Sequence, residues 1–267
     1  MARGLDHIVH AVRDLDAAAE LYRRLGFTVG ARNRHPWGTH NHIIQFAGVF
    51  IELLTLAEPE KLGVDGFSVL FARYNDDFVK RGEGLSMLLL ESKDARADEV
   101  AFRAAGIAAS EGMRFEREAK RPDGSPVKVG FSLAFAEDKA ASDIHFATCQ
   151  QHYPENFWNP AFQQHSNGAE TVAGVVVVVE EPVHHRDFLL AFTGAQNSRD
   201  IGDGFAIDLP RGAIELTTPA AFERRFGLPA PDVLRGQRLA GLRFSGRALA
   251  AGCHSVLGAV LVFEAGA

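Results

Sequence analysis

In the first sixty residues, apolar positions follow two patterns, one typical of a β-strand and one typical of an α-helix. An apolar segment at residues 7–12 predicts a strand, and apolar residues three and four apart predict a helix over residues 14–25. Asp14 suits the N-cap of that helix, and Gly26 suits the left-handed position after it. Three β-like segments follow, the last at residues 49–56, so the predicted order is β-α-β-β-β.

The same order of elements recurs along the chain. A second copy has a strand at 85–90 and a helix at 95–105, and a third copy opens with a strand at 172–179. The tail, residues 238–267, is an abbreviated fourth copy. Because one such unit leaves a face of its sheet uncovered, units must pair. We therefore predict an α+β protein of tandem paired β-α-β-β-β modules that form cupped mixed sheets.

The best point to divide the chain is the junction at residues 159–169, which contains Pro160 and Gly168. We expect residues 1–160 to hold paired modules one and two, and residues 161–267 to hold module three and the abbreviated fourth. Modules one and two are expected to form the functional cup.

Charge and cysteine content narrow the class of protein. A net charge of −6 argues against a nucleic-acid or anionic-membrane binder, which needs a basic patch. The longest strongly apolar run, residues 175–179, is far too short to span a bilayer. Two cysteines cannot form a disulfide framework, and the N-terminus lacks an apolar signal region. These features predict a cytoplasmic protein whose partner is a small molecule.

Several short segments resemble a known superfamily. Residues 5–8, 13–16, 25–27 and 51–53 resemble the vicinal-oxygen-chelate superfamily. That superfamily includes glyoxalase I, extradiol dioxygenases and bleomycin-resistance proteins. The segments that resemble its glyoxalase-like domain subgroup are His35-Pro36-Trp37-Gly38-Thr39-His40-Asn41, 121–124 and 165–169. The resemblance implies paired modules around a cup, and it does not fix a reaction.

The resemblance implies that His7 and Glu52 are metal ligands. A neutral imidazole suits zinc, iron, manganese or nickel. Glu52 interrupts an apolar strand, where a carboxylate is costly to bury unless it is paired or coordinated. The alternatives are a histidine satisfied at a strand edge and a glutamate exposed on an edge strand.

The second module lacks the matching ligands. The position that matches His7 falls near Ser86 or Met87, neither of which is a good ligand for a hard metal. Gln150 and His152 share a face if their strand persists, and His152 would then complete a two-histidine, one-carboxylate triad with His7 and Glu52. The alternative is that His152 lines a substrate pocket or packs the module junction, without any metal.

The loop at residues 35–41 is expected at the rim of the cup. We expect substrate contacts from six residues: His35, Trp37, Thr39, Asn41, Gln150 and Trp158.

Two functions remain open at this point. The leading hypothesis is a metal-dependent lyase, isomerase or dioxygenase that acts on a small substrate chelated through two oxygens, with Glu52 and His152 also taking part in catalysis. The competing hypothesis is a metal-free protein of the bleomycin-resistance kind that sequesters a small molecule. Since paired modules often complete a site through a partner chain, a homodimer is one assembly that the sequence allows.

Overall fold

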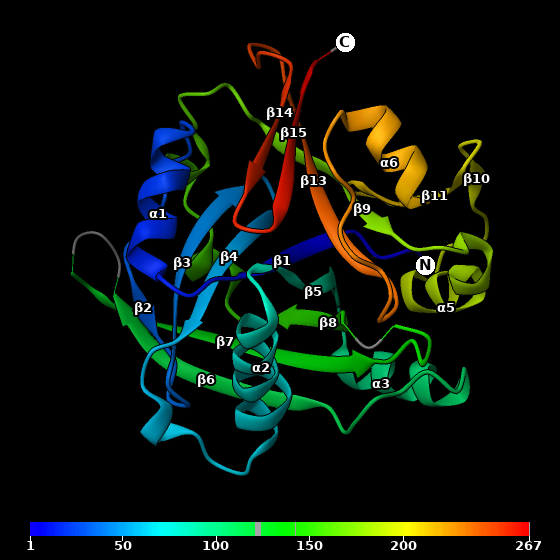
Figure 1. Cartoon of the computed structure of the whole chain (residues 1–267). Coiled ribbons are helices and arrows are strands. Elements are labelled where there is room, and N and C mark those ends of the chain that lie inside the picture. The colour runs from blue at the N-terminus through cyan, green and yellow to red at the C-terminus, as the bar shows by residue number, and fades with distance from the viewer. Residues whose placement is uncertain (121–123, 142, 267) are drawn as a thin grey trace.

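The chain forms two curled, mixed β-sheets that share one hydrophobic core (Figure 1). The structure is a computed structural model, and it describes residues 1–120, 124–141 and 143–266. The two sheets with few helices confirm the expected α+β fold of tandem paired modules. Among the described helices, none has both the length and the apolar character needed to cross a membrane.

Modules one and two build the first sheet. Its strands are β1 (Leu5–Ala11), β2 (Asn33–Arg34), β3 (Thr39–Phe46), β4 (Val49–Leu56), β5 (Gly84–Glu91), β6 (Met113–Lys120), β7 (Pro126–Ala136) and β8 (His145–Gln151). Their order across the sheet is β2-β3-β4-β1-β5-β8-β7-β6. The modules therefore meet where β1 pairs with β5, in antiparallel register. Three residues of the segment 121–124, which resembles the glyoxalase-like subgroup, lie outside the described residues.

The two helices of these modules match each other. They are α1 (Leu15–Arg24) and α3 (Ala95–Ala104), each of ten residues. Asp14 and Asp94 cap them, because each carboxylate accepts a hydrogen bond from a backbone N–H of the first turn. The predicted capping and the predicted repeat are both confirmed at this point.

Modules three and four build the second sheet. Its strands are β9 (Thr171–Val178), β10 (Arg199–Asp200), β11 (Gly204–Asp208), β12 (Ala213–Thr217), β13 (Arg238–Gly246), β14 (Gly252–Val256) and β15 (Ala259–Ala265). Their order is β10-β11-β12-β9-β13-β15-β14. The helices of this half are η4 (Pro182–His185), α5 (Arg186–Thr193) and α6 (Pro219–Phe226). The sequence reading missed α6 and β14. The division of the chain into domains at residue 160 stays a prediction.

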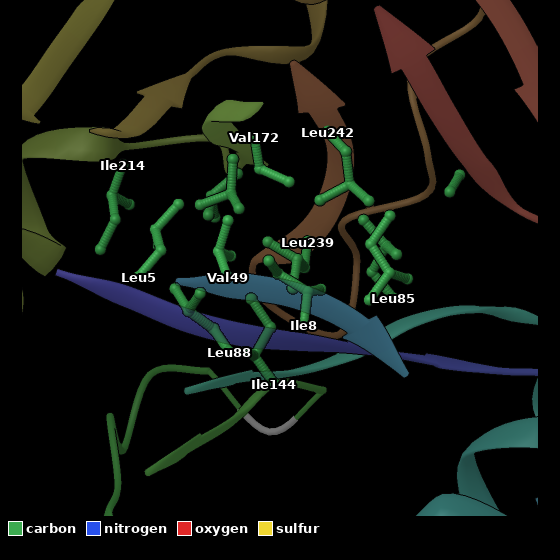
Figure 2. Packing of buried hydrophobic residues seen from close by; sticks show 14 of the residues in the cluster. Leu5, Ile8, Val49, Leu85, Leu88, Ile144, Val172, Ile214, Leu239 and Leu242 are labelled. Carbon is green, nitrogen blue, oxygen red and sulfur yellow. The ribbon is translucent and has the colours of Figure 1, made fainter. Parts of the chain in front are cut away.

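The core lies between the two sheets. Leu5, Ile8 and Leu88 of the first sheet face Val172 and Leu242 of the second, and all five are fully buried (Figure 2). Burying a side chain of this size contributes about 1.5–3 kcal/mol relative to leaving it in water. Since this face of the first sheet is committed to packing, its other face is the one available for a site.

An insertion between modules one and two covers part of that other face. It contains η1 (Pro59–Lys61), the π-helical segment η2 (Ser68–Arg73) and α2 (Tyr74–Arg81). Phe67 and Phe71 of this insertion pack with Met87 and Leu89 of β5 in a second, smaller cluster. Two short helices, α4 (Pro154–Phe157) and η3 (Pro160–Gln163), follow β8. The sequence analysis predicted none of these elements.

Candidate functional site

A cavity of about 530 Å³ opens on the face of the first sheet that points away from the core. Nine aromatic residues line it, and these are Trp37, Phe50, Phe67, Phe71, Phe115, Phe131, Phe157, Trp158 and Phe162. The polar side chains that matter below are His7, His35, Asn41, Glu52 and Arg117. This composition is typical of a small-molecule site, which is mainly apolar with a few placed polar groups.

A β-bulge in β1 sets up the floor of the cavity. Leu5 pairs with Leu90 and His7 pairs with Leu89, so Asp6 is an extra residue in β1. Nδ1 of His7 lies 2.6 Å from Oδ1 of Asp6, and both side chains are buried. The other oxygen of Asp6 accepts a hydrogen bond from Nε2 of Gln151 at 3.0 Å. Asp6 therefore fixes the orientation of the His7 ring.

His7 and Glu52 lie together, on neighbouring strands. Nε2 of His7 is 4.0 Å from Oε2 of Glu52, and the His7 ring stacks on Phe50 at 4.3 Å between ring centroids. Asn41 donates a hydrogen bond from Nδ2 to Oε1 of Glu52 at 2.5 Å. Burial raises the pKa of Glu52, and His7, Asn41 and Arg117 act in the opposite direction. The result is a buried carboxylate that faces a free imidazole nitrogen.

The second module offers no counterpart to this pair. Val9 pairs with Glu52 in module one, and Leu89 pairs with Ala147 in module two. Since α1 and α3 begin eighty residues apart, at Leu15 and Ala95, the position that matches His7 is Met87 and the one that matches Glu52 is Ala147. Neither a thioether nor a methyl group is a ligand for a hard divalent metal.

The structure does not bring His152 or Gln150 to the cavity. His152 follows β8, and its Nε2 makes a 2.8 Å hydrogen bond with Oγ of Ser132. The side chain of Gln150 points the other way, where it accepts from the N–H of Ala95 and donates to the carbonyl of Lys93. Cys149 is the β8 residue that lines the cavity.

Of the four loop residues predicted to contact the substrate, His35, Trp37 and Asn41 line the cavity. The fourth, Thr39, does not line it and contacts His35 instead. Nδ1 of His35 lies 2.8 Å from Oγ1 of Thr39, which is buried behind the cavity. Burial, with the nearby charge of Arg117, lowers the pKa of His35 to about 3, so its ring is neutral.

The two tryptophans of the cavity are not equally available to a ligand. Trp37 stacks on His35 at 4.8 Å and on Phe67 at 4.6 Å, and it is 7% exposed. Little of its ring surface is therefore left for a ligand. Trp158, also expected from the sequence, lines the cavity beside Phe157.

The sequence reading missed Arg117 and Asp6. Arg117 lies on β6, where residues 113–119 alternate inward and outward, and Phe115 and Arg117 line the cavity. That alternation was a usable signal, since an arginine in phase with a phenylalanine points to the same side. Asp6 gave no comparable signal, because the bulge that turns it toward His7 depends on pairing with β5.

Asp6, His7 and Cys149 form the candidate metal cluster found among the described residues. Their donor atoms all lie within 4.8 Å of one another. The 2.6 Å contact between Asp6 and His7 is a hydrogen bond, which makes Asp6 a support for His7 rather than a second ligand. Burial, with the charges of Asp6 and Glu52, raises the pKa of the Cys149 thiol, so a metal would have to displace its proton.

The second sheet has no equivalent site at the matching positions. Glu215 pairs with Val176 as Glu52 pairs with Val9, and Gly174 stands where His7 does. The Glu215 carboxylate accepts hydrogen bonds from Arg225 and Arg243. This carboxylate is therefore neutralised by two arginines.

Comparisons with known proteins support the fold. The family model described as glyoxalase-like domain matches residues 5–192. Comparison with the curated proteins gives no match. A hypothetical protein from Staphylococcus aureus has a TM-score of 0.74 and 14% identity, with 98% of each chain covered. A mutant of 4-hydroxymandelate synthase from Streptomyces coelicolor has a TM-score of 0.50 and 14% identity, with 91% of this chain and 71% of that chain covered.

At these identities the structural similarities show the fold alone. The family model spans more than half of the chain, from β1 into α5, and confirms the resemblance seen in the sequence. The chain belongs to the glyoxalase-like domain family.

Proposed function

We propose that the protein is an enzyme that acts on a small oxygenated substrate in this cavity, with a divalent metal held by His7 and Glu52. The reaction class is a lyase, isomerase or dioxygenase reaction. The observation that carries the proposal is the buried series Asp6, His7 and Glu52 at the cavity floor. Burying a carboxylate opposite an imidazole in an apolar cavity costs desolvation free energy. Such a pair is therefore a candidate to bind a cation or to act on a substrate.

The donor chemistry of module one fits a metal. With Nδ1 directed at Asp6, His7 presents Nε2 to the cavity, and this is how metal-binding histidines are usually held. Asn41 holds the Glu52 carboxylate on the same side. A bound divalent cation would act as a Lewis acid on the substrate oxygens. Asp6 and Asn41 would orient the two ligands, and the aromatic walls would exclude water.

The third ligand remains open. His152, predicted from the sequence, would have to leave its hydrogen bond with Ser132 to reach the cavity. Cys149 lies closer to His7 and lines the cavity. A soft thiolate favours zinc or iron, whereas two oxygen or nitrogen ligands with water favour manganese, zinc or nickel.

The competing function is metal-free binding of a small molecule. The observation that favours it is the pair Met87 and Ala147, which puts no metal ligand at the second-module positions that match His7 and Glu52. In that case His7 and Glu52 would serve as hydrogen-bonding groups for the ligand.

Metal titration separates the two functions. Protein purified without chelator is analysed for bound metal, stripped, and titrated with zinc, iron(II), manganese and nickel. The variants are His7→Ala, Glu52→Gln and Asp6→Asn, and His184→Ala is the matched control because His184 lies exposed beside Glu181. His152→Ala and Cys149→Ser test the third ligand in the same titration.

The proposal expects one equivalent of metal that is lost in His7→Ala and in Glu52→Gln. Asp6→Asn should weaken the affinity by about 10- to 100-fold, as loss of a group that orients a ligand does. The control should bind as the wild type does. Metal binding that neither His7→Ala nor Glu52→Gln changes would overturn the proposed site, and a protein that binds none of the four metals would favour the binding function.

A further inference from the structure

The geometry points to an apolar, ring-sized carboxylate as the ligand of this cavity, with its carboxylate bound by Arg117 and its ring held between the aromatic walls. This inference names the ligand class of the site proposed above. It rests on the proposed function only in using the same cavity, and it does not require the metal.

Arg117 brings a positive charge into the cavity without a partner for it. It is the one arginine or lysine among the described residues that line the cavity. No described carboxylate lies within ion-pair distance of its guanidinium. Its charge acts at longer range, because it acts to lower the pKa of both Glu52 and His35. A hydrogen bond from Nη1 to the carbonyl of Glu118, at 3.3 Å, orients the side chain.

Two hydrogen-bond donors of the cavity lining are also unused. Nε of Arg117 and Nε1 of Trp37 are buried and have no hydrogen-bond partner. A buried donor left unsatisfied is destabilising, and a ligand acceptor or a water molecule would remove that cost. Because both groups can only donate, they favour a ligand that carries acceptor oxygens. A planar carboxylate matches the fork of a guanidinium especially well.

The aromatic side chains of the wall would contact the part of the ligand that does not carry the carboxylate. Phe115 stands edge-on to Trp37 at 4.9 Å, and Phe131 packs against Phe157 at 5.7 Å. Edge and face contacts of this kind favour aromatic rings over flexible chains. A cavity of about 530 Å³ accepts a ligand of this size.

The orientation of the ligand follows from the positions of the two charges. Arg117 comes from β6 at one edge of the sheet, and Glu52 comes from β4 on the other side of the module junction. No described ion pair joins Arg117 to Glu52, so the guanidinium keeps its donors for the carboxylate of the ligand. The rest of the ligand then lies over the floor, where His7 and Phe50 stack.

Three probes separate charge from ring binding. Phenylacetate carries both features, phenylacetamide is its neutral counterpart, and acetate lacks the ring. The readout is tryptophan fluorescence, since the chain has two tryptophans and both Trp37 and Trp158 line the cavity. The titrations are run in chelator, so that the result does not depend on the metal.

The variants are Arg117→Gln and Arg117→Lys, and the matched control is Arg114→Gln. Arg114 lies on the same strand but faces outward, where it pairs with Glu116 at 3.0 Å. The urea midpoint of each variant is measured alongside, to show that the fold is kept. His7→Ala is included because it removes a proposed metal ligand and leaves Arg117 in place.

Wild-type protein should bind phenylacetate about 10- to 100-fold more tightly than phenylacetamide, the value of a charge-assisted contact, and acetate more weakly still. Arg117→Gln should abolish the preference for acid over amide, Arg117→Lys should keep part of it, and Arg114→Gln should keep all of it. Equal binding of acid and amide, failure of phenylacetate to bind at millimolar concentration, or an unchanged preference in Arg117→Gln would overturn the inference. Retained preference in His7→Ala with loss of metal binding would show that the two proposals stand separately.

Discussion

Acidification should destabilise this protein steeply, because three buried histidines cannot take up protons in the folded state. Burial lowers the pKa of His10 to about 4, of His145 to about 4 and of His35 to about 3. His10 is fully buried between the hydroxyl of Tyr22 and the carbonyl of Leu257, where an imidazolium would have to be desolvated.

The sign and size of the effect follow from proton linkage. Each folded-state pKa lies below the unfolded value of about 6.5, so the unfolded chain binds protons first as the pH falls. Each histidine therefore leaves the free energy of unfolding unchanged at pH 7.5 and lowers it by about 2 kcal/mol at pH 5. The three together remove about 6 kcal/mol, which is comparable to the whole stability of many domains. Glu52, whose pKa is raised, works in the opposite direction and reduces this loss.

Urea unfolding at a series of pH values between 7.5 and 5 measures the effect. The variant is His145→Gln, which cannot be protonated and can still donate to the carbonyl of Leu70. Its loss of unfolding free energy over this range should be about 2 kcal/mol smaller than that of the wild type. The exposed His184→Gln should lose as much as the wild type. Wild-type stability that is constant over this range would refute the reasoning, and so would an equal loss in His145→Gln.

Three further predictions concern stability and are measured by urea or thermal unfolding. Phe102→Ala in α3 should cost about 3–5 kcal/mol, since that ring is fully buried, whereas Val100→Ala on the exposed face should stay within about 0.5 kcal/mol. Gly204→Ala should be much worse than Gly106→Ala, because its Cβ would lie 1.9 Å from the carbonyl oxygen of Leu216 while the site at Gly106 is open; equal costs would contradict this. Asp14→Ala should cost about 1 kcal/mol and Asp14→Asn much less, and an equal loss in both would exclude the capping role.

Local patterns in the sequence were sufficient to predict the modules. The cap at Asp14 and the carboxylate at Glu52 inside an apolar strand were both readable, because each depends on neighbours within a few residues. The bulge at Asp6 was not readable, since it depends on the register between β1 and β5. For Arg117 the alternation along β6 was a usable signal that it shares a side with Phe115, and only the fold shows that this side faces the cavity.

The insertion occupies the space beside Met87, the second-module position that matches His7. Nδ2 of Asn75 in α2 lies 3.3 Å from the sulfur of Met87, and the ring of Tyr74 stacks on His145 at 3.3 Å. Met87 and His145 pair across β5 and β8, as His7 and Phe50 pair across β1 and β4. The half of the cup that would hold the second pair of ligands is therefore filled by α2. A histidine at position 87 would therefore meet Asn75 rather than a cation. The cavity that remains belongs to His7, Glu52 and Arg117.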